Sequence, residues 1–227
     1  MNGTVWAFGD SFTRGCCVGG PIDGNYLEQP YVKIIAEKLQ MKCNNKAREI
    51  MTFTDIFATI TKHLQYIKKG DIVIAGPTSL FRIMYPTDYE YVQDYHGTED
   101  TGEESLTGLN LPSIESAAHF INAKNVDRKK LKMFLIDWWE NIVQPNEDAF
   151  NKFYSDYYTN WCSYFTSIGV PFYWWDNVWV HHRTKLRCKC GHWNQEYHFE
   201  FANILLTFMK DNPYGKLPNP AQPIIQL

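Results

Sequence analysis

Near its start the chain reads Val5-Trp6-Ala7-Phe8-Gly9-Asp10-Ser11-Phe12-Thr13-Arg14-Gly15, an apolar run followed by a turn and a serine. The run from Val5 to Phe8 is typical of a parallel strand that is buried on both faces. Where a helix then starts, unpaired backbone N–H groups can stabilise an oxyanion, and a serine hydroxyl can attack a carbonyl if a base is near. Ser11 is therefore a candidate nucleophile. The alternative is that it only caps the helix.

The composition is that of an ordinary globular protein. The 227 residues, 44% of them hydrophobic, suit one domain with a sizeable core. A formal charge of −3 and a pI near 6.2 show no excess of basic residues of the kind that binds nucleic acid or an anionic membrane. No transmembrane run and no signal peptide is visible in the sequence. The six cysteines are few and irregularly spaced, which favours cytoplasmic synthesis over a disulfide scaffold.

Strand and helix patterns alternate after this first segment. Apolar residues recur at helical spacing over 31–39, and 41–44 reads as a short second strand. An amphipathic helix is predicted over 54–67 with Thr54 as its N-cap, and 71–75 is short, apolar and β-branched. This order indicates a parallel α/β sheet in which the first apolar run and 71–75 are adjacent strands, with helices on both faces.

The second half of the chain is less regular. Residues 85–112 are rich in Tyr, Asp, Glu, Gly and Thr with little periodicity, which predicts a long surface insertion. Beyond it the patterns predict a strand over 171–175 and helices over 114–122, 126–143, 147–167 and 195–209. From Pro213 the tail is predicted to be extended along the surface. No repeat or linker interrupts the chain, so residues 1–227 are predicted to form one domain.

A serine nucleophile needs a base, and His192 is the leading candidate for that role. It lies in Cys190-Gly191-His192-Trp193-Asn194-Gln195-Glu196-Tyr197-His198, just before the last predicted helix. Open α/β sheets gather functional groups at the carboxyl ends of their strands, so a histidine there can face the serine. We therefore expect the Ser11 hydroxyl and the His192 ring to share a hydrogen bond. His198 is the competing base, and a purely structural histidine is the alternative for His192.

Together these motifs resemble the sequence blocks of the SGNH, or GDSL-type, esterase family. Gly9-Asp10-Ser11-Phe12-Thr13 is similar to the first block, and Asn45 is similar to the start of the second. Gly76-Pro77-Thr78-Ser79 stands where the third block is expected, directly after the third predicted strand. His192-Trp193-Asn194 followed by His198 is similar to the final block. The resemblance spans most of the chain in the correct order.

The resemblance implies a three-layer α/β/α sandwich with a central parallel sheet, flavodoxin-like and of the SGNH hydrolase type. It also implies hydrolysis of acetyl or short acyl esters by a serine acyl-enzyme route, with an acylated glycan as one candidate substrate. No cofactor, nucleic acid or membrane is an expected partner. Ser11 is then the nucleophile and His192 the base, while the Ser11 N–H and Thr78, with Ser79 beside it, hold the oxyanion.

Three positions depart from the family pattern, and one is the second-block glycine, in whose place stands Glu49 or Ile50. Lys189 stands where the family usually has an aspartate, three residues before the histidine, so a backbone carbonyl or Asp176 is expected to orient His192. Thr78 stands where the third block usually has an asparagine, and a hydroxyl donates only one hydrogen bond. These departures favour an alternative function: a non-catalytic glycan-binding or structural module of a larger assembly such as a virus particle.

Other candidate residues have two readings each. Asp10 is either catalytic or fixes backbone N–H groups of the turn, and Arg82 either holds an anionic group of the substrate or forms a surface salt bridge. Cys188 and Cys190 with His192 are potential metal ligands, but their spacing is tighter than that of zinc sites, so no metal is predicted. Aromatic residues at 85, 89, 91, 95, 174, 175, 179 and 193 either stack on sugars or pack in the core.

Overall fold

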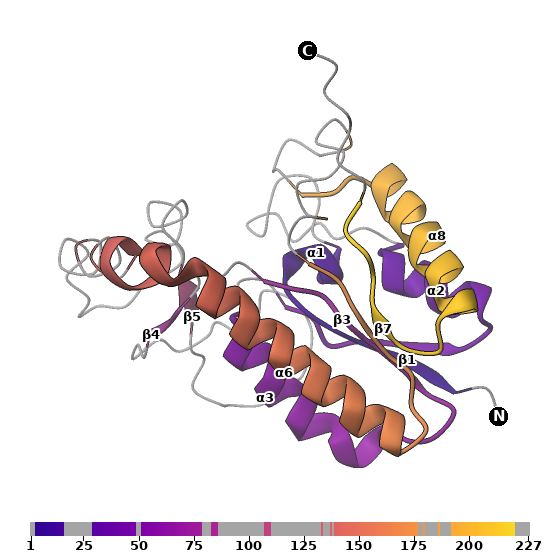
Figure 1. Cartoon of the computed structure of the whole chain (residues 1–227). Helices are drawn as coiled ribbons and strands as arrows, with labels where there is room; N and C mark the ends of the chain where they lie inside the picture. Colours follow the sequence, from indigo (N-terminus) through magenta and orange to yellow (C-terminus); the bar gives the residue numbers. More distant parts are fainter. Residues whose placement is uncertain are drawn as a thin grey trace.

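The computed structural model describes residues 3–15, 29–48, 51–78, 83–85, 107–109, 133, 137, 139–176, 179, 186 and 192–220. Within these ranges the chain forms a five-stranded parallel sheet with helices on both faces, and a separate two-stranded ladder (Figure 1). The predicted α/β class with a central parallel sheet is therefore confirmed. No helix in these ranges is both long enough and apolar enough to pass through a lipid bilayer.

The sheet has the strand order β2-β1-β3-β6-β7, and every neighbouring pair runs parallel. Its strands are β1 (Thr4–Phe8), β2 (Lys42–Asn45), β3 (Ile72–Ala75), β6 (Phe172–Trp174) and β7 (Gly215–Lys216). The predicted pairing of the first apolar run with 71–75 is confirmed, because β1 and β3 are adjacent and parallel. The order is that of flavodoxin-like folds, in which the strand order reverses between β1 and β3.

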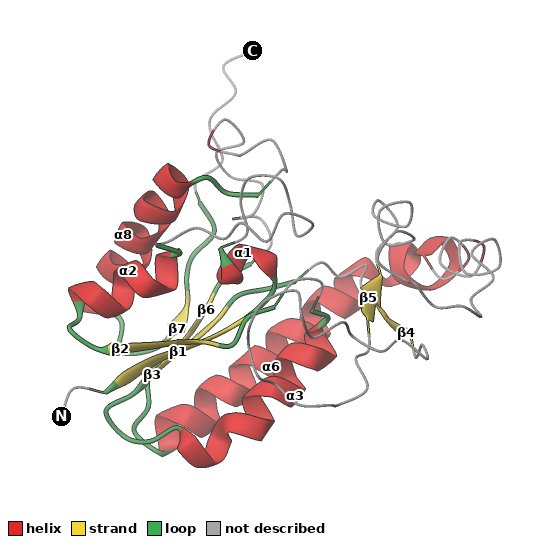
Figure 2. Cartoon of the chain, turned by 180° about the vertical axis from the view of Figure 1, so that it is seen from behind, coloured by secondary structure: helices red, strands yellow, loops and turns green. Residues whose placement is uncertain are grey.

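Among the residues that the structure describes, two helices cover each face of the sheet. α2 (Tyr31–Lys38) and α8 (Gln195–Asp211) lie together on one face. α3 (Phe53–His63) and α6 (Glu147–Ser167) lie on the other face, as the view from behind also shows (Figure 2). The predicted three-layer α/β/α sandwich is therefore confirmed.

β1 supplies side chains to both cores, because successive side chains of a strand point to opposite faces of the sheet. Val5 and Ala7 belong to the apolar cluster that contains the buried side chains of α2 and α8. Trp6 and Phe8 belong to the cluster formed with α3 and α6. A strand that is buried on both faces needs a continuous apolar run, and this is the run that opens the sequence.

Thr52, and not the predicted Thr54, is the N-cap of α3. Its hydroxyl accepts a hydrogen bond from the Asp55 N–H at 3.2 Å, and the Asp55 carboxylate accepts one from the Thr52 N–H at 2.8 Å. This capping box satisfies two donors that a helix start otherwise leaves unpaired. At its other end α3 continues into the 3₁₀ helix η2 (Leu64–Tyr66), so the predicted helical segment is confirmed with an earlier start.

The predicted insertion at 85–112 lies mostly outside the described residues. At its edges β4 (Ile83–Tyr85) and β5 (Thr107–Leu109) pair antiparallel. The predicted helix over 114–122, and most of 126–143, also lie outside them. The π-helix η5 (Trp139–Val143) and the 3₁₀ helix η6 (Gln144–Asn146) lead into α6, whose bounds match the prediction.

The tail after α8 was predicted to lie extended along the surface, but part of it belongs to the sheet. Gly215 and Lys216 form β7, which pairs parallel with β6 and completes the sheet on that side. The next residue, Leu217, donates its N–H to the Trp174 carbonyl at 2.8 Å and is buried in the core of α2 and α8. The tail is therefore part of the sheet and of one core.

A buried carboxylate ties the start of β1 to the start of β3. Asp71 is 2% exposed and directly precedes β3. It accepts hydrogen bonds from the Thr4 N–H at 2.8 Å, the Trp6 indole N–H at 3.1 Å and the Lys68 N–H at 3.1 Å. Three donors bond to this one side chain, so its removal leaves the buried Trp6 indole N–H and two partly buried backbone N–H groups without this acceptor.

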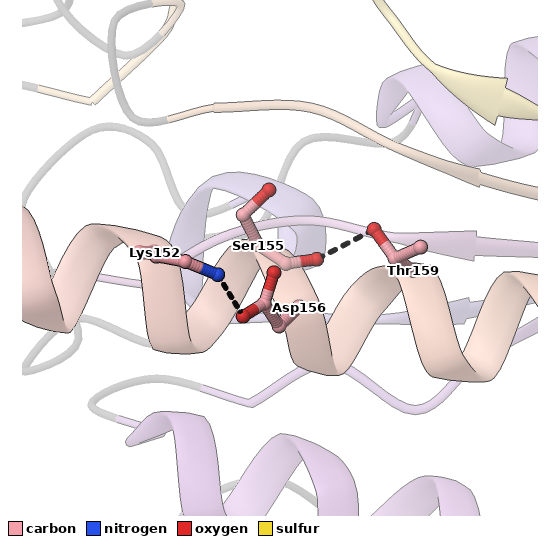
Figure 3. A network of polar contacts seen from close by, with 4 residues as sticks. All are labelled: Lys152, Ser155, Asp156 and Thr159. Atoms are coloured by element: carbon pink, nitrogen blue, oxygen red, sulfur yellow. Dashed lines mark hydrogen bonds and ion pairs between the residues drawn. The ribbon is translucent and has the colours of Figure 1, made fainter.

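We expect Asp71→Ala to lower the free energy of unfolding by about 3 kcal/mol, because the loss of one acceptor strands three donors. The matched control is Asp156→Ala on α6. Asp156 pairs with Lys152 at 2.6 Å, but the two side chains are 59% and 75% exposed (Figure 3). The same view shows the Thr159 hydroxyl, which donates to the Ser155 carbonyl. An exposed pair of this kind contributes less than about 1 kcal/mol. Urea denaturation of both variants measures the difference, and equal losses would contradict the anchoring role of Asp71.

Candidate active site

The turn after β1 places Ser11 at the carboxyl end of the strand. Gly9 has φ +155°, a conformation that favours glycine, and it lets the chain turn directly after Phe8. Asp10 is the N-cap of the four-residue helix α1 (Ser11–Arg14), and its carboxylate accepts a hydrogen bond from the Phe12 N–H at 3.0 Å. Ser11 is thus the first residue of α1, beside the point where the strand order reverses. In open sheets of this kind that point is where ligands bind.

His192 reaches Ser11 from the opposite end of the chain. Its Nε2 lies 2.9 Å from Ser11 Oγ, so the two side chains share the expected hydrogen bond. The histidine lies three residues before α8. The start of this helix is fixed by Asn194, whose side chain accepts a hydrogen bond from the Tyr197 N–H at 2.9 Å. Ser11 is 4% exposed and His192 is half-buried. A hydroxyl bonded to an imidazole nitrogen can lose its proton to that nitrogen.

Aromatic contacts hold the two segments against each other. The Phe12 ring lies 5.0 Å from the His192 ring and 5.4 Å from the Trp193 ring, measured between centroids. Trp193 is fully buried in the core of α2 and α8. The residues that follow Ser11 and His192 therefore pack together, which limits how far the two functional side chains can separate.

His198, the competing base, occupies a different place. Its side chain is fully buried, and Nδ1 accepts a hydrogen bond from the Tyr31 N–H at 3.1 Å at the start of α2. Burial, with a smaller contribution from His192, lowers the pKa of His198 to about 3. Its Nε2 has no hydrogen-bond partner among the described residues; because Nδ1 accepts, Nε2 is the protonated nitrogen of the neutral ring. His198 is therefore a structural acceptor, and His192 is the imidazole that contacts Ser11.

Of the two side chains predicted to hold the oxyanion, only Thr78 lies in the described residues, and its hydroxyl is bonded elsewhere. The Thr78 hydroxyl donates to the Met51 carbonyl at 2.6 Å, and the side chain is fully buried. A hydroxyl has one hydrogen to donate, so the predicted side-chain donor is already committed elsewhere. Ser79 lies outside the described residues, as does Arg82.

The two predicted aspartates have structural partners. Asp10 fixes a backbone N–H of the turn, which is one of its two predicted readings. Asp176 follows β6 and pairs with Lys216 of β7 at 2.6 Å, an ion pair between neighbouring strands. That a backbone carbonyl or Asp176 orients His192 stays a prediction.

The other residues singled out in the sequence are either not described or buried in the core. Cys188 and Cys190 lie outside the described residues, and within the described part of the chain no three His, Cys, Asp or Glu side chains cluster as metal ligands do. The side chains predicted at 85, 89, 91 and 95 are also not described. Trp174, Trp175, Trp179 and Trp193 are at most 7% exposed, so these four pack in the core and are not a sugar-stacking surface.

Thr13 is a site residue that the sequence did not single out. It is fully buried between the ends of β1 and β3, and its carbonyl accepts a hydrogen bond from the Asn45 amide at 2.9 Å. A Cβ atom on Gly76 would lie 2.0 Å from Thr13 Oγ1, and one on Gly9 would lie 2.4 Å away. Both strand ends therefore need glycine to admit this side chain. A glycine directly after each of the two strands was the available signal.

The comparisons with known proteins add little to this geometry. No family model matches the chain, and no curated protein matches it. A solved structure from Desulfitobacterium hafniense DCB-2, described as a lipolytic protein of the G-D-S-L family, aligns at 13% identity. The alignment covers 94% of this chain and 75% of that one, with a TM-score of 0.32. A likeness this low says nothing about activity, so the function has to be argued from the residues themselves.

Proposed function

We propose that this protein is a serine hydrolase that cleaves acetyl or short acyl esters through a covalent acyl-enzyme. The observation that carries the proposal is the hydrogen bond between Ser11 Oγ and His192 Nε2, 2.9 Å long, at the carboxyl end of β1. A nucleophile and a base within hydrogen-bond reach are the minimum that covalent acyl transfer requires. The motifs around both residues support the same chemistry, because they resemble those of GDSL-type esterases.

In the proposed reaction His192 Nε2 takes the hydroxyl proton while Ser11 Oγ forms a bond to the carbonyl carbon of the ester. The tetrahedral intermediate then expels the alkoxide, which leaves as an alcohol after receiving the proton from His192. A water molecule attacks the acyl-serine in the same way, with His192 again accepting and returning a proton. The products are a carboxylic acid, an alcohol and the free enzyme.

The oxyanion donor in this proposal is the backbone N–H of Ser11, at the start of α1. The Thr78 hydroxyl is not part of it, because it donates to Met51. Loss of one oxyanion donor typically costs about 10²–10³ in rate. We therefore propose a slow esterase, with an acylated carbohydrate as the candidate natural substrate.

A second candidate function is a non-catalytic binding or structural module with the same fold. The engaged hydroxyl of Thr78 favours it, as does Lys189 at the position where the family usually has an aspartate. The two functions differ in one property: only the enzyme needs a Ser11 hydroxyl that reacts as a nucleophile.

We expect a fluorophosphonate probe to label the wild-type protein at Ser11, because the activated oxygen displaces fluoride and forms a bond to phosphorus. Peptide mass spectrometry locates the label. Ser11→Ala should be unlabelled. Ser163→Ala is the control: this serine lies exposed on α6, with its hydroxyl bonded to the Thr159 carbonyl, and the variant should label like wild type. Equal labelling of wild type and Ser11→Ala would overturn the enzymatic proposal in favour of the module.

A further inference from the structure

Tyr31 is hydrogen-bonded to a residue near each member of the Ser11–His192 pair. Its hydroxyl donates to Thr13 Oγ1 at 3.2 Å, two residues after Ser11. Its backbone N–H donates to His198 Nδ1 at 3.1 Å, six residues after His192. A single residue at the start of α2 is therefore hydrogen-bonded to the segment that carries the nucleophile and to the segment that carries the base.

Three successive residues that begin with Ser11 each have a contact partner. Ser11 meets His192 first, and the next residues of the two segments, Phe12 and Trp193, then pack ring against ring at 5.4 Å. Below them Thr13 meets Tyr31, whose ring lies 6.2 Å from that of Trp193, measured between centroids. Ser11, Phe12 and Thr13 thus each have a contact partner, and that of Thr13 is the fully buried Tyr31.

The Tyr31 hydroxyl is held from both sides. It accepts a hydrogen bond from the Trp175 indole N–H at 3.3 Å, next to β6, while it donates to Thr13. The side chain is fully buried, and burial raises the pKa of Tyr31 well above its usual value. The hydroxyl therefore keeps its proton and stays a donor to Thr13 across the pH range in which the protein is folded.

Thr13 connects the fixed Tyr31 hydroxyl to the position of Ser11. Its side chain fills the space between Gly9 and Gly76, at the ends of the two central strands. Because α1 has only four residues, a movement of Thr13 moves Ser11 with it. A misplacement of about 1 Å at a reacting atom can cost about 10²-fold in rate.

We propose that Tyr31 is a positioning residue, which sets the distance between Ser11 and His192 through its hydrogen bond to Thr13. The effect on rate rests on the proposed hydrolase function. The effect on the Ser11–His192 hydrogen bond does not, because it concerns geometry alone. The two parts can therefore be tested separately.

The decisive variant is Tyr31→Phe, which removes the hydroxyl and keeps the ring and the backbone N–H. The matched control is Tyr173→Phe. Tyr173 is 3% exposed in the same core, and its hydroxyl donates to the Asn212 carbonyl at 2.9 Å, away from the nucleophile segment. Each variant removes one tyrosine hydroxyl, but Tyr31→Phe also removes the acceptor of the Trp175 N–H, so the larger loss in melting temperature is expected from Tyr31→Phe.

We expect Tyr31→Phe to lower kcat for p-nitrophenyl acetate by about 10- to 100-fold with little change in KM, and Tyr173→Phe to leave kcat near the wild-type value. Thr13→Val, which keeps the shape and loses the hydroxyl, should match Tyr31→Phe. The double variant should be no slower than either single one, because both act through one hydrogen bond. Thr13→Ser should recover most of the activity.

The geometric part is read from the ¹⁵N resonance of His192 Nε2, which reports the hydrogen bond to Ser11. It should shift in Tyr31→Phe and stay at the wild-type position in Tyr173→Phe. This readout does not need turnover: a shift confined to Tyr31→Phe in a protein without esterase activity would refute the hydrolase and keep the positioning role. An unchanged resonance in Tyr31→Phe, or equal kinetic losses in the two tyrosine variants, would overturn the positioning role.

Discussion

Ser11→Ala is expected to abolish enzymatic turnover of p-nitrophenyl acetate, and His192→Ala is expected to lower kcat by about 10⁴- to 10⁶-fold. The reason is that the two side chains act as one unit: the hydroxyl is a poor nucleophile until the imidazole 2.9 Å away takes its proton. Removal of either member therefore costs nearly as much as removal of both, and the Ser11→Ala/His192→Ala double variant should be no slower than Ser11→Ala alone. Steady-state kinetics of the three variants checks this.

The control for this experiment is His63→Ala. Activated esters react slowly with any accessible imidazole, and His63 lies half-buried on α3, in a different part of the molecule. Its ring packs near Trp6 and Phe8, on the other face of the sheet from Tyr31 and α8. Its loss should leave kcat unchanged. If wild type turns over no faster than Ser11→Ala with several acyl esters, the hydrolase proposal fails.

Acidification is expected to destabilise the protein through His198. The unfolded chain takes up this proton near pH 6.5, whereas burial lowers the pKa in the folded state to about 3. Between these values the unfolded state binds more protons, so stability is full above about pH 6.5 and falls as the pH drops. The loss is about 1.4 kcal/mol per pH unit, or about 3 kcal/mol at pH 4. Urea denaturation at pH 7 and pH 4 measures it.

The physical cause lies in the surroundings of the ring. In the described part of the chain, the titratable side chains near His198 are Tyr31, which is neutral and stacks on the ring, and His192, whose positive charge opposes a second one. Protonation of Nδ1 would also remove the acceptor for the Tyr31 N–H. His198→Asn keeps an acceptor near that position and carries no proton, so it should lose much less stability between pH 7 and pH 4. His63→Asn should keep the wild-type pH dependence, and an equal pH dependence in wild type and His198→Asn would contradict this account.

The sequence was sufficient for the layout of the fold because that layout follows from apolar periodicity. The doubly buried run of β1, the amphipathic pattern of α3 and the long helix α6 all lie where the patterns predicted them. The N-cap of α3 was misplaced by two residues, because Thr52 and Thr54 are equally good caps in sequence and only the reciprocal bonds with Asp55 select Thr52. β7 was missed because two residues of edge strand have no periodicity to detect.

Only those residues of the candidate site whose type and position indicate a chemical role could be predicted from the sequence. A serine after a strand and a histidine before a helix identified Ser11 and His192. The roles of Tyr31 and Thr13 could not be read in this way, because a tyrosine at an apolar helix position looks like any core residue until the partner of its hydroxyl is known. The commitment of Thr78 to Met51 is a tertiary contact between separate loops, which no local pattern reports.

Ser11 and His192 are 181 positions apart in the chain, and this separation has a consequence for synthesis on the ribosome. At the usual rate of roughly 5–20 residues per second, the serine leaves the peptidyl-transferase centre about 10 to 40 s before the histidine is added. During that time β1, β2 and β3 can already form, yet the nascent chain carries a hydroxyl with no base. On the proposed function, reactivity therefore appears only after the His192 segment has been made and packs beside Ser11, so an activity-based probe added to a translation reaction would report that late step and not the earlier pairing of β1, β2 and β3.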